Sequence, residues 1–163
     1  MQELAQDLVR ELFDYKDGAL HWKQSLNRRI RIGSRAGSLN KQDGRVQVRI
    51  NGSMYKAHRL VFLWHHGYLP EYIDHIDGNP ANNRIENLRE CSLSQNQWNR
   101  KVCKNNTSGY KGVWFSKQTN KWQVEVHSEG RKYYGGLFAD AESANKAAIE
   151  LRKSLHKDFA KHK

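Results

Sequence analysis

The chain has 163 residues, which suits one medium-sized domain or two small ones. Its formal net charge of +11 and isoelectric point near 9.8 favour an anionic polymer as the partner, and no apolar run approaches the roughly 20 residues that cross a bilayer. Two cysteines without a CxxC pair argue against a disulfide framework or a zinc knuckle, and the acid-bearing amino terminus argues against a secretory signal.

The first predicted element is a short amphipathic helix over residues 2–15, which we expect to end near Gly18 and to serve packing alone. Its apolar side chains recur at helical spacing, at Leu4, Leu8, Leu12 and Phe13.

Short strands follow this helix. Segments 19–23, 45–50 and 53–56 have strand-like composition. Between the last two lies Asn51-Gly52, a pair typical of a tight hairpin turn. We therefore predict a hairpin over residues 45–56.

An arginine-rich, glycine-punctuated loop interrupts the strands between residues 27 and 45. A solvated surface and an arm that contacts DNA phosphates are equally compatible with it. On the second interpretation its DNA-binding residues include Arg28, Arg29 and Arg31.

Residues 58–66 are apolar and predict a helix that packs behind the segment that follows it. This helix contains His58, His65 and His66. No cysteine or carboxylate accompanies the three histidines, so we interpret them as core or surface residues rather than metal ligands.

The chain is organised around residues 72–100, YIDHIDGNPANNRIENLRECSLSQNQWNR. Asp74 and His75 end an apolar-led segment that predicts a strand, and residues 88–91 predict a returning strand after a loop of turn formers. Ser92 and Gln95 match a capping box, which predicts that a helix begins there. Two strands, a loop and a helix folded together would bring Asp74, His75 and Asn96 close to one another.

These residue types suit phosphodiester hydrolysis with a hard cation. Carboxylate and amide oxygens are ligands for Mg²⁺, which uses only one or two protein groups and keeps several waters. A neutral imidazole is a natural general base for an attacking water.

The stretch resembles the HNH nuclease family, whose ββα-metal core has an Asp-His pair, a middle Asn and a closing His or Asn. DHIDGNPANNRIENLR and the upstream AHRLVFLWHHG are similar to phage-borne and intron-borne homing endonucleases. The resemblance implies His75 as the general base and Asn87 as the residue that braces the loop and orients it. It further implies Asp74 and Asn96 as ligands of Mg²⁺ or Mn²⁺. Asn at the closing position, in place of His, weakens the case for a transition metal.

The remaining polar residues of the loop are attributed to turn formation, although Asn79 or Asn83 can assist there. This group consists of Asp77, Asn79, Asn82 and Asn83.

A second unit is expected after a basic linker at residues 100–109. Residues 110–116, 121–128 and 131–138 predict three strands, of which the middle one alternates apolar and polar side chains. Asp140 then predicts a helix cap. The apolar stripe of that helix is Ala144, Ala148, Leu151, Leu155 and Phe159.

This unit resembles the plant ethylene-response-factor type of DNA-binding domain, the apetala-two domain. The matching pieces are SGYKGV, KWQVEV, GRKYYGGLF, ADAESANKAA and LHKDFA. The resemblance implies that the sheet enters the major groove of duplex DNA. It places on DNA the residues Lys111, Trp114, Ser116, Glu125, His127, Lys132 and Tyr134. Trp114, Ser116 and His127 differ from the usual plant residues, so the sequence preference does not transfer.

We therefore predict an α+β protein with an HNH nuclease core at residues 1–99 and a three-stranded antiparallel sheet packed on one helix at residues 110–163. The predicted function is a metal-dependent homing-type endonuclease that nicks double-stranded DNA, favoured as a monomer. Its expected location is cytoplasmic, in the host cell if a phage encodes it, with no membrane partner. The alternative is a non-catalytic, sequence-specific DNA-binding regulator.

Overall fold

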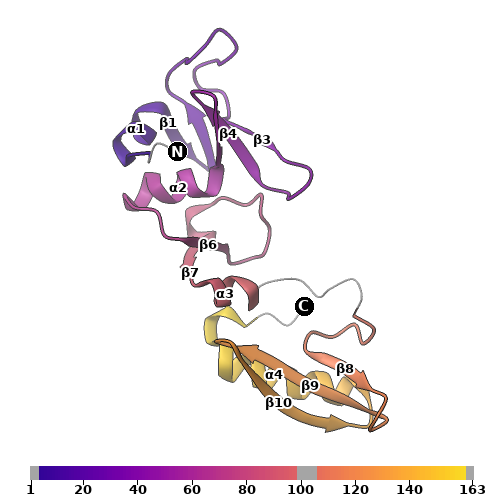
Figure 1. Ribbon diagram of the computed structural model, residues 1–163. Helices are drawn as coiled ribbons and strands as arrows, with labels where there is room; N and C mark the ends of the chain where they lie inside the picture. Colours follow the sequence, from indigo (N-terminus) through magenta and orange to yellow (C-terminus); the bar gives the residue numbers. More distant parts are fainter. Residues whose placement is uncertain (1–3, 99–105, 161–163) are drawn as a thin grey trace. The chain divides into compact units, whose positions relative to one another are not determined.

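The structure, a computed structural model, describes residues 4–98 and 106–160. Contacts divide the chain into two compact units, Met1–Cys91 and Ser92–Lys163, and each unit combines helices with small antiparallel sheets (Figure 1). The first unit thus ends before the boundary that the sequence suggests at residue 99. Residues 100–105 of the predicted linker, and Asn99 of the predicted helix, lie outside the described residues.

The first unit begins with helix α1 (Gln6–Leu12), which leads directly into the hairpin β1 (Phe13–Lys16) and β2 (Ala19–Trp22). The predicted helix was therefore wrong over residues 13–15. Asp17 and Gly18 both have positive φ, at 49° and 80°, which is the geometry of a two-residue hairpin turn. This turn pairs Phe13 with Trp22. Residues 13–15 therefore form a strand, although the spacing of their apolar side chains is that of a helix.

The central sheet has the order β3-β4-β5, formed by β3 (Ser38–Leu39), β4 (Val46–Ile50) and β5 (Ser53–Lys56). The predicted Asn51-Gly52 hairpin is confirmed, with φ of 46° and 85° at the two turn residues. The predicted helix over residues 58–66 is confirmed as α2 (Ala57–His66). It ends where Gly67 adopts a left-handed conformation.

Helix α2 packs against β2, β4, β5 and α1 and closes the core of the first unit. That core is apolar and well buried, and includes Val9, Phe13, Val48, Leu60 and Val61. The last elements of the unit are β6 (Tyr72–His75), the 3₁₀ helix η1 (Ile85–Asn87) and β7 (Leu88–Cys91). Strands β6 and β7 form a separate two-stranded sheet, so the two predicted strands around the loop are confirmed.

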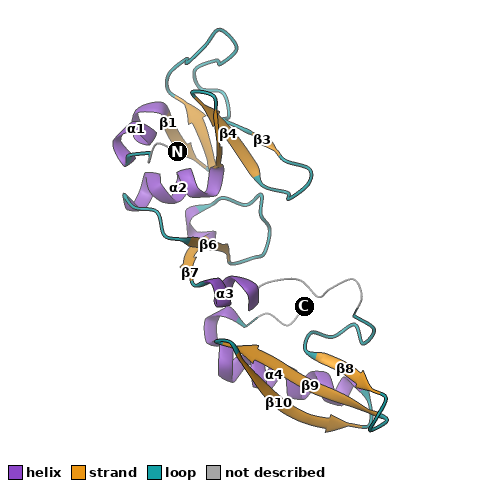
Figure 2. Cartoon of the chain, in the orientation of Figure 1, coloured by secondary structure: helices purple, strands orange, loops and turns teal. Residues whose placement is uncertain are grey.

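The second unit contains α3 (Leu93–Trp98) and a sheet of order β10-β9-β8. Helix α4 covers one face of this sheet (Figure 2). The sheet strands are β8 (Val113–Ser116), β9 (Lys121–Ser128) and β10 (Arg131–Phe138). Helix α4 (Ala141–His156) precedes the 3₁₀ helix η2 (Lys157–Phe159). The predicted cap is confirmed, because Asp140 Oδ1 accepts a hydrogen bond from the Ser143 amide at 2.8 Å.

The buried stripe of α4 differs from the predicted one. Ala144 and Ala148 are fully buried against Val113 and Val124, as expected. The stripe then continues through Arg152 and His156, which are 1% and 4% exposed. Leu151 is partly buried against the same cluster, as predicted, so Arg152 and His156 add to the predicted stripe rather than replace its leucines.

Among the described helices, none is both long enough and apolar enough to span a membrane.

Candidate active site

The candidate site lies where β6 ends. In the register of the β6–β7 pair, Asp74 lies opposite Arg89 and His75 lies opposite Leu88. Both Asp74 and His75 are 5% exposed, although strand alternation alone would point them to opposite faces. The loop from residue 76 to residue 87 contacts His75 through Asn83.

His75 is held by Asn83, which is itself 3% exposed. His75 Nε2 lies 3.1 Å from Asn83 Oδ1. Since this oxygen accepts, Nε2 carries the proton and Nδ1 is the basic nitrogen of the neutral ring. Burial lowers the pKa of His75, the hydrogen bond to Asn83 opposes that shift, and the charge of Arg45 adds to it. The imidazole is thus neutral at pH 7.

His58 encloses His75 from the side of α2. The two rings meet edge to face, with centroids 5.1 Å apart. Burial lowers the pKa of His58 to about 2, and the positive charge of Arg45 contributes to that shift. Arg45 Nη1 lies 3.4 Å from His58 Nε2, so the carboxyl-terminal end of the arginine-rich segment brings a cation to the histidine pair.

Asn87 braces the loop without a recorded bond to His75. Its side-chain nitrogen donates to Asp77 Oδ1 at 3.0 Å and to the Asn82 carbonyl at 2.8 Å, and its side-chain oxygen accepts from the Asp77 amide. Burial raises the pKa of Asp77, but hydrogen bonds from Asn82, from the Asn79 amide and from Asn87 outweigh burial, so the pKa is lowered overall. The bracing role predicted for Asn87 has a direct geometric basis, whereas the residue that touches His75 is Asn83.

Asp74 is fixed by its cross-strand neighbour. Arg89 Nε and Nη2 each lie 3.0 Å from Asp74 Oδ2. This ion pair orients the carboxylate at the mouth of the loop. Within residues 4–98 and 106–160 no group of three His, Cys, Asp or Glu side chains is arranged to hold a metal. A carboxylate with one amide oxygen fits the chemistry of Mg²⁺, which needs few protein ligands.

Asn96, the second predicted ligand, lies on α3 in the other unit. The predicted capping box of this helix is confirmed. The Ser92 hydroxyl accepts from the Gln95 amide at 3.2 Å, and Gln95 Oε1 accepts from the Ser92 amide at 2.8 Å. The position of Asn96 beside Asp74 stays a prediction.

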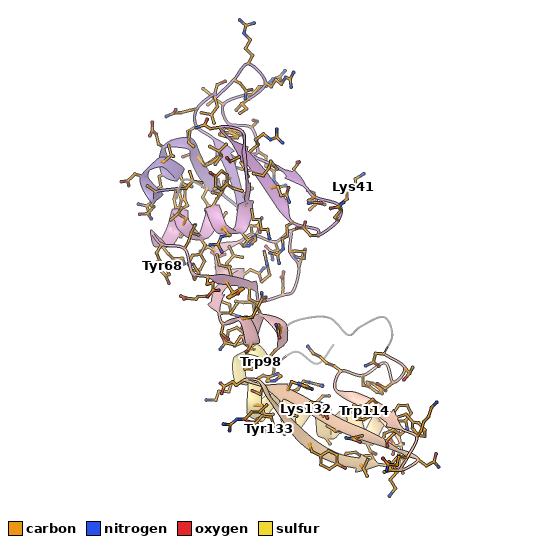
Figure 3. The ribbon with its side chains drawn as sticks, viewed as in Figure 1. Lys41, Tyr68, Trp98, Trp114, Lys132 and Tyr133 are labelled. Atoms are coloured by element: carbon orange, nitrogen blue, oxygen red, sulfur yellow. The ribbon has the colours of Figure 1, made fainter. Side chains whose placement is uncertain are left out.

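The arginine-rich segment divides into two parts. Arg28, Arg29 and Arg31 are exposed on a loop drawn at the far end of the first unit from β6 and β7 (Figure 1). The turn after β3, whose Lys41 is labelled in Figure 3, approaches the candidate site more closely. There, a Cβ added to Gly44 would lie 3.1 Å from the Pro80 side chain in the loop from residue 76 to residue 87. The structure therefore brings Arg45, and not the three predicted arginines, to His75.

The open face of the second sheet gathers five of the seven residues predicted to contact DNA. Register pairs Glu125 with Tyr134 and His127 with Lys132, and Trp114 lies opposite Gln123. Figure 3 labels Trp114 and Lys132 on this sheet. Trp114 and Tyr134 are 47% and 60% exposed. Glu125 Oε1 bridges His127 Nε2 at 2.9 Å and Lys132 Nζ at 3.3 Å.

Two of the seven predicted residues lie elsewhere. Ser116 is buried at the end of β8. Lys111 donates from Nζ to the Trp98 carbonyl of α3. Their predicted contacts with DNA would therefore require rearrangement.

The sequence analysis did not name Arg89, interpreted His58 only as a core or surface residue, and named Asn83 only as a residue that can assist in the loop. Four similar asparagines and aspartates surround Asn83 in the sequence, so only the path of the loop singles it out. Arg89 had one usable signal, because the register of a hairpin that starts at Asp74 pairs the two side chains.

Comparisons with known proteins address the same segment. Residues 55–98 match the family model described as HNH endonuclease. The chain is also 39% identical over 114 residues to "Protein 3.8" of Escherichia phage T7, a match that covers 66% of this chain and 92% of that protein. No solved structure matches.

Proposed function

The chain belongs to the family of Protein 3.8 of Escherichia phage T7 and has an HNH endonuclease domain, and from this premise we propose that it is a metal-dependent endonuclease of the homing type that nicks duplex DNA. An HNH endonuclease domain implies a nuclease with DNA as its substrate. The observation that carries the finer proposal is the buried, neutral His75 held by Asn83 next to the ion-paired Asp74.

In this proposal His75 acts as the general base. Asn83 retains the Nε2 proton, so Nδ1 takes a proton from the water that attacks the phosphorus in line. Asn87 braces the loop from residue 76 to residue 87 through Asp77 and Asn82. Arg45 supplies a positive charge suited to the incoming phosphate.

Asp74 and Asn96 are the proposed ligands of Mg²⁺ or Mn²⁺. When bound, the cation would polarise the scissile phosphate and stabilise the leaving oxygen. Arg89 contributes by fixing the rotamer of Asp74. One base serves one strand, so a monomer is expected to nick rather than to break both strands.

Targeting is assigned to the second unit, as an apetala-two-type domain over residues 110–163 that follows a linker at 100–109. The exposed Trp114 and Tyr134 and the Glu125–His127–Lys132 cluster support a face that reads the groove. The exposed Arg28, Arg29 and Arg31 are proposed as additional phosphate contacts.

The test is cleavage of supercoiled plasmid with Mg²⁺ and with chelator. We expect nicked circles with Mg²⁺ and none with chelator. His75→Ala should lower the rate on the order of 10²-fold to 10⁴-fold, the usual contribution of a general base, with DNA affinity nearly unchanged. His66→Ala is the control, because His66 is an exposed histidine at the end of α2 and is not part of the proposed site. Cutting by His75→Ala at the control rate would refute the assignment, and binding without any cutting by the unaltered protein would favour a DNA-binding regulator.

A further inference from the structure

The second unit contains a cavity that none of the proposed catalytic or metal-binding residues lines. Its volume is about 710 Å³. Described residues that line it come from α3, from the segment before β8, from the end of β9 and from α4; they include Trp98, Lys111, Gly112, Gly130, Arg152 and His156.

Arg152 is the central feature of this cavity. It is 1% exposed, and its Nη1 donates to the Lys111 carbonyl. Its Nε and Nη2 are buried and have no hydrogen-bond partner. These two nitrogens share one edge of the planar guanidinium and direct their hydrogens in parallel, which is the geometry that grips a phosphate or carboxylate with two bonds.

A buried, unpaired guanidinium is energetically unfavourable. Burial lowers the pKa of Arg152, yet an arginine remains charged in a protein near neutral pH. An uncompensated buried charge normally acquires an anionic partner. No ion pair of Arg152 with a described carboxylate is recorded.

The acidic residues that line the cavity do not supply that partner. Glu125 directs its carboxylate to His127 and Lys132 on the open face of the sheet. Val124 and Val126, its neighbours along β9, are buried, as strand alternation requires. Glu129 lies in the β9–β10 turn with a positive φ of 50° and is exposed.

Gly112 supports the same interpretation. Its φ is +73°, and a Cβ there would lie 2.8 Å from the Glu125 carbonyl and 3.5 Å from Arg152 Nη1. The absence of a side chain at Gly112 leaves room for the Lys111 carbonyl to accept from Arg152 Nη1, so the Nε and Nη2 edge is the one without a recorded partner.

We propose that this cavity binds a phosphate group, gripped by the Nε and Nη2 edge of Arg152. The phosphate comes either from a free phosphate or nucleotide or from the DNA backbone. The proposal does not depend on nuclease activity, because it rests on the second unit alone.

The test is nuclear magnetic resonance of the full-length protein titrated with inorganic phosphate, against chloride at equal ionic strength. The Arg152 Nε–H signal and the Gly112 and Gly130 amides should move saturably with phosphate. In Arg152→Met, which keeps the length and removes the charge, phosphate affinity should fall on the order of 100-fold, since two charge-assisted hydrogen bonds are lost.

Two further variants control for charge and for folding. Arg131→Met removes an exposed arginine of the same unit and should leave the phosphate response unchanged. Arg152→Lys keeps the charge without the fork and should bind phosphate at least about 10-fold more weakly. The amide spectrum of each variant reports whether it is folded.

Adding a short duplex separates the two sources of phosphate. If DNA supplies the phosphate, the duplex shifts the Gly112 amide signal. The Arg152→Met variant then loses one phosphate contact, so its slope of log affinity against log salt becomes shallower by about 0.9. If a free phosphate is the ligand, inorganic phosphate moves that amide and the duplex does not. If neither phosphate nor duplex moves the Arg152 Nε–H signal, or if the glycine amides respond equally in Arg152→Met, the proposal is overturned.

Discussion

At the scale of single residues, the properties of His75 come from three neighbours. Burial and the charge of Arg45 favour the neutral imidazole, Asn83 fixes which nitrogen carries the proton, and His58 packs edge-on against the ring. A neutral imidazole of fixed orientation can accept a proton at pH 7 without first releasing one. Asn83 is therefore a positioning residue, and its loss should change the rate of cleavage more than the binding of DNA.

Asn83→Ala should lower the cleavage rate on the order of 10-fold to 100-fold, because His75 would lose the partner that sets its orientation. Asn83→Asp keeps an acceptor oxygen and should retain more activity. The control is Asn79→Ala, an exposed asparagine of the same loop whose Oδ1 accepts only from the Ala81 amide among its recorded bonds. Single-turnover rates on a nicked-plasmid assay, with DNA affinity measured in parallel, check this. Equal rates for Asn83→Ala and Asn79→Ala would contradict it.

His58 should make the stability of the first unit depend on pH. Its folded-state pKa is about 2, well below the ordinary 6.5, because burial and the nearby charge of Arg45 disfavour the proton. At pH values between about 2 and 6.5, the unfolded chain therefore binds a proton on His58 that the folded chain does not. The contribution of the neutral His58 to stability is fully present above about pH 6.5 and is lost as the pH falls. At about 1.4 kcal/mol per pH unit, the free energy of unfolding should decrease by about 2 kcal/mol from pH 6.5 to pH 5.

Urea unfolding at the two pH values measures this decrease. His58→Gln should reduce it, and His75, whose pKa burial also lowers, should contribute to the remainder. His66→Gln, which alters an exposed histidine of the same helix, should leave it unchanged. An unaltered pH dependence in His58→Gln would exclude His58 as its source.

At the scale of elements, the β1–β2 hairpin supports the segment that leads into η1. The Tyr15 hydroxyl accepts from the Ile85 amide at 3.0 Å, and a Cβ at Gly18 would lie 2.8 Å from Arg84 Cγ. A hairpin distant in sequence thus fixes the end of the loop that contacts His75. Changes in its turn should be felt at the candidate site.

Gly18→Ala should destabilise the first unit by about 1 to 3 kcal/mol, because a positive φ strains alanine and the new methyl group would clash with Arg84. Gly33→Ala separates the two causes. Gly33 has nearly the same φ, +79°, but nothing lies within 4 Å of its added Cβ. We expect Gly33→Ala to cost only about 1 kcal/mol, from backbone strain alone. Urea midpoints of the two variants compare these costs, and equal values would show that the contact with Arg84 does not matter.

The predictability of these elements follows from how local their causes are. The β9 and β10 strands and the capped α4 were predicted correctly, since alternation and an Asp140 cap are encoded in neighbouring residues. The short hairpin at Phe13–Lys16 was missed because helical spacing and the Asp17-Gly18 turn point to different structures. Asp74 and His75 were placed at the end of a strand correctly. Asn83 and Arg152 were not singled out, because their burial depends on contacts with residues distant in sequence.

At the scale of the whole molecule, basic charge is concentrated in the later part of the chain. From Arg100 onward there are 14 basic and 6 acidic residues, a net charge of +8 out of the total of +11. The first unit has its own apolar core, and so does the second. Catalysis and most of the attraction to DNA are therefore expected to be separable.

Truncation after about Lys104 tests that separation. When a protein neutralises several DNA phosphates, the logarithm of its affinity falls linearly with the logarithm of the salt concentration, with a slope of roughly 0.9 per phosphate contact. Residues 105–163 hold 11 basic and 6 acidic residues, a net charge of +5, so their removal should flatten the slope and relax site preference. Weak nicking should persist, since Asp74, His75, Asn87 and Asn96 all precede the cut.

The matched comparison keeps the chain whole and replaces Arg28, Arg29 and Arg31 by alanine. If the second unit carries recognition, this triple variant should lose at most about three contacts, roughly 2.7 in slope, and keep its choice of site, because phosphate contacts position a protein without reading sequence. Lys132→Ala or Trp114→Ala should instead alter site choice, because both side chains lie on the open sheet face. A truncated protein with full affinity, slope and site choice would place recognition in the arginine-rich segment between residues 28 and 45, and the sheet domain would then require another role.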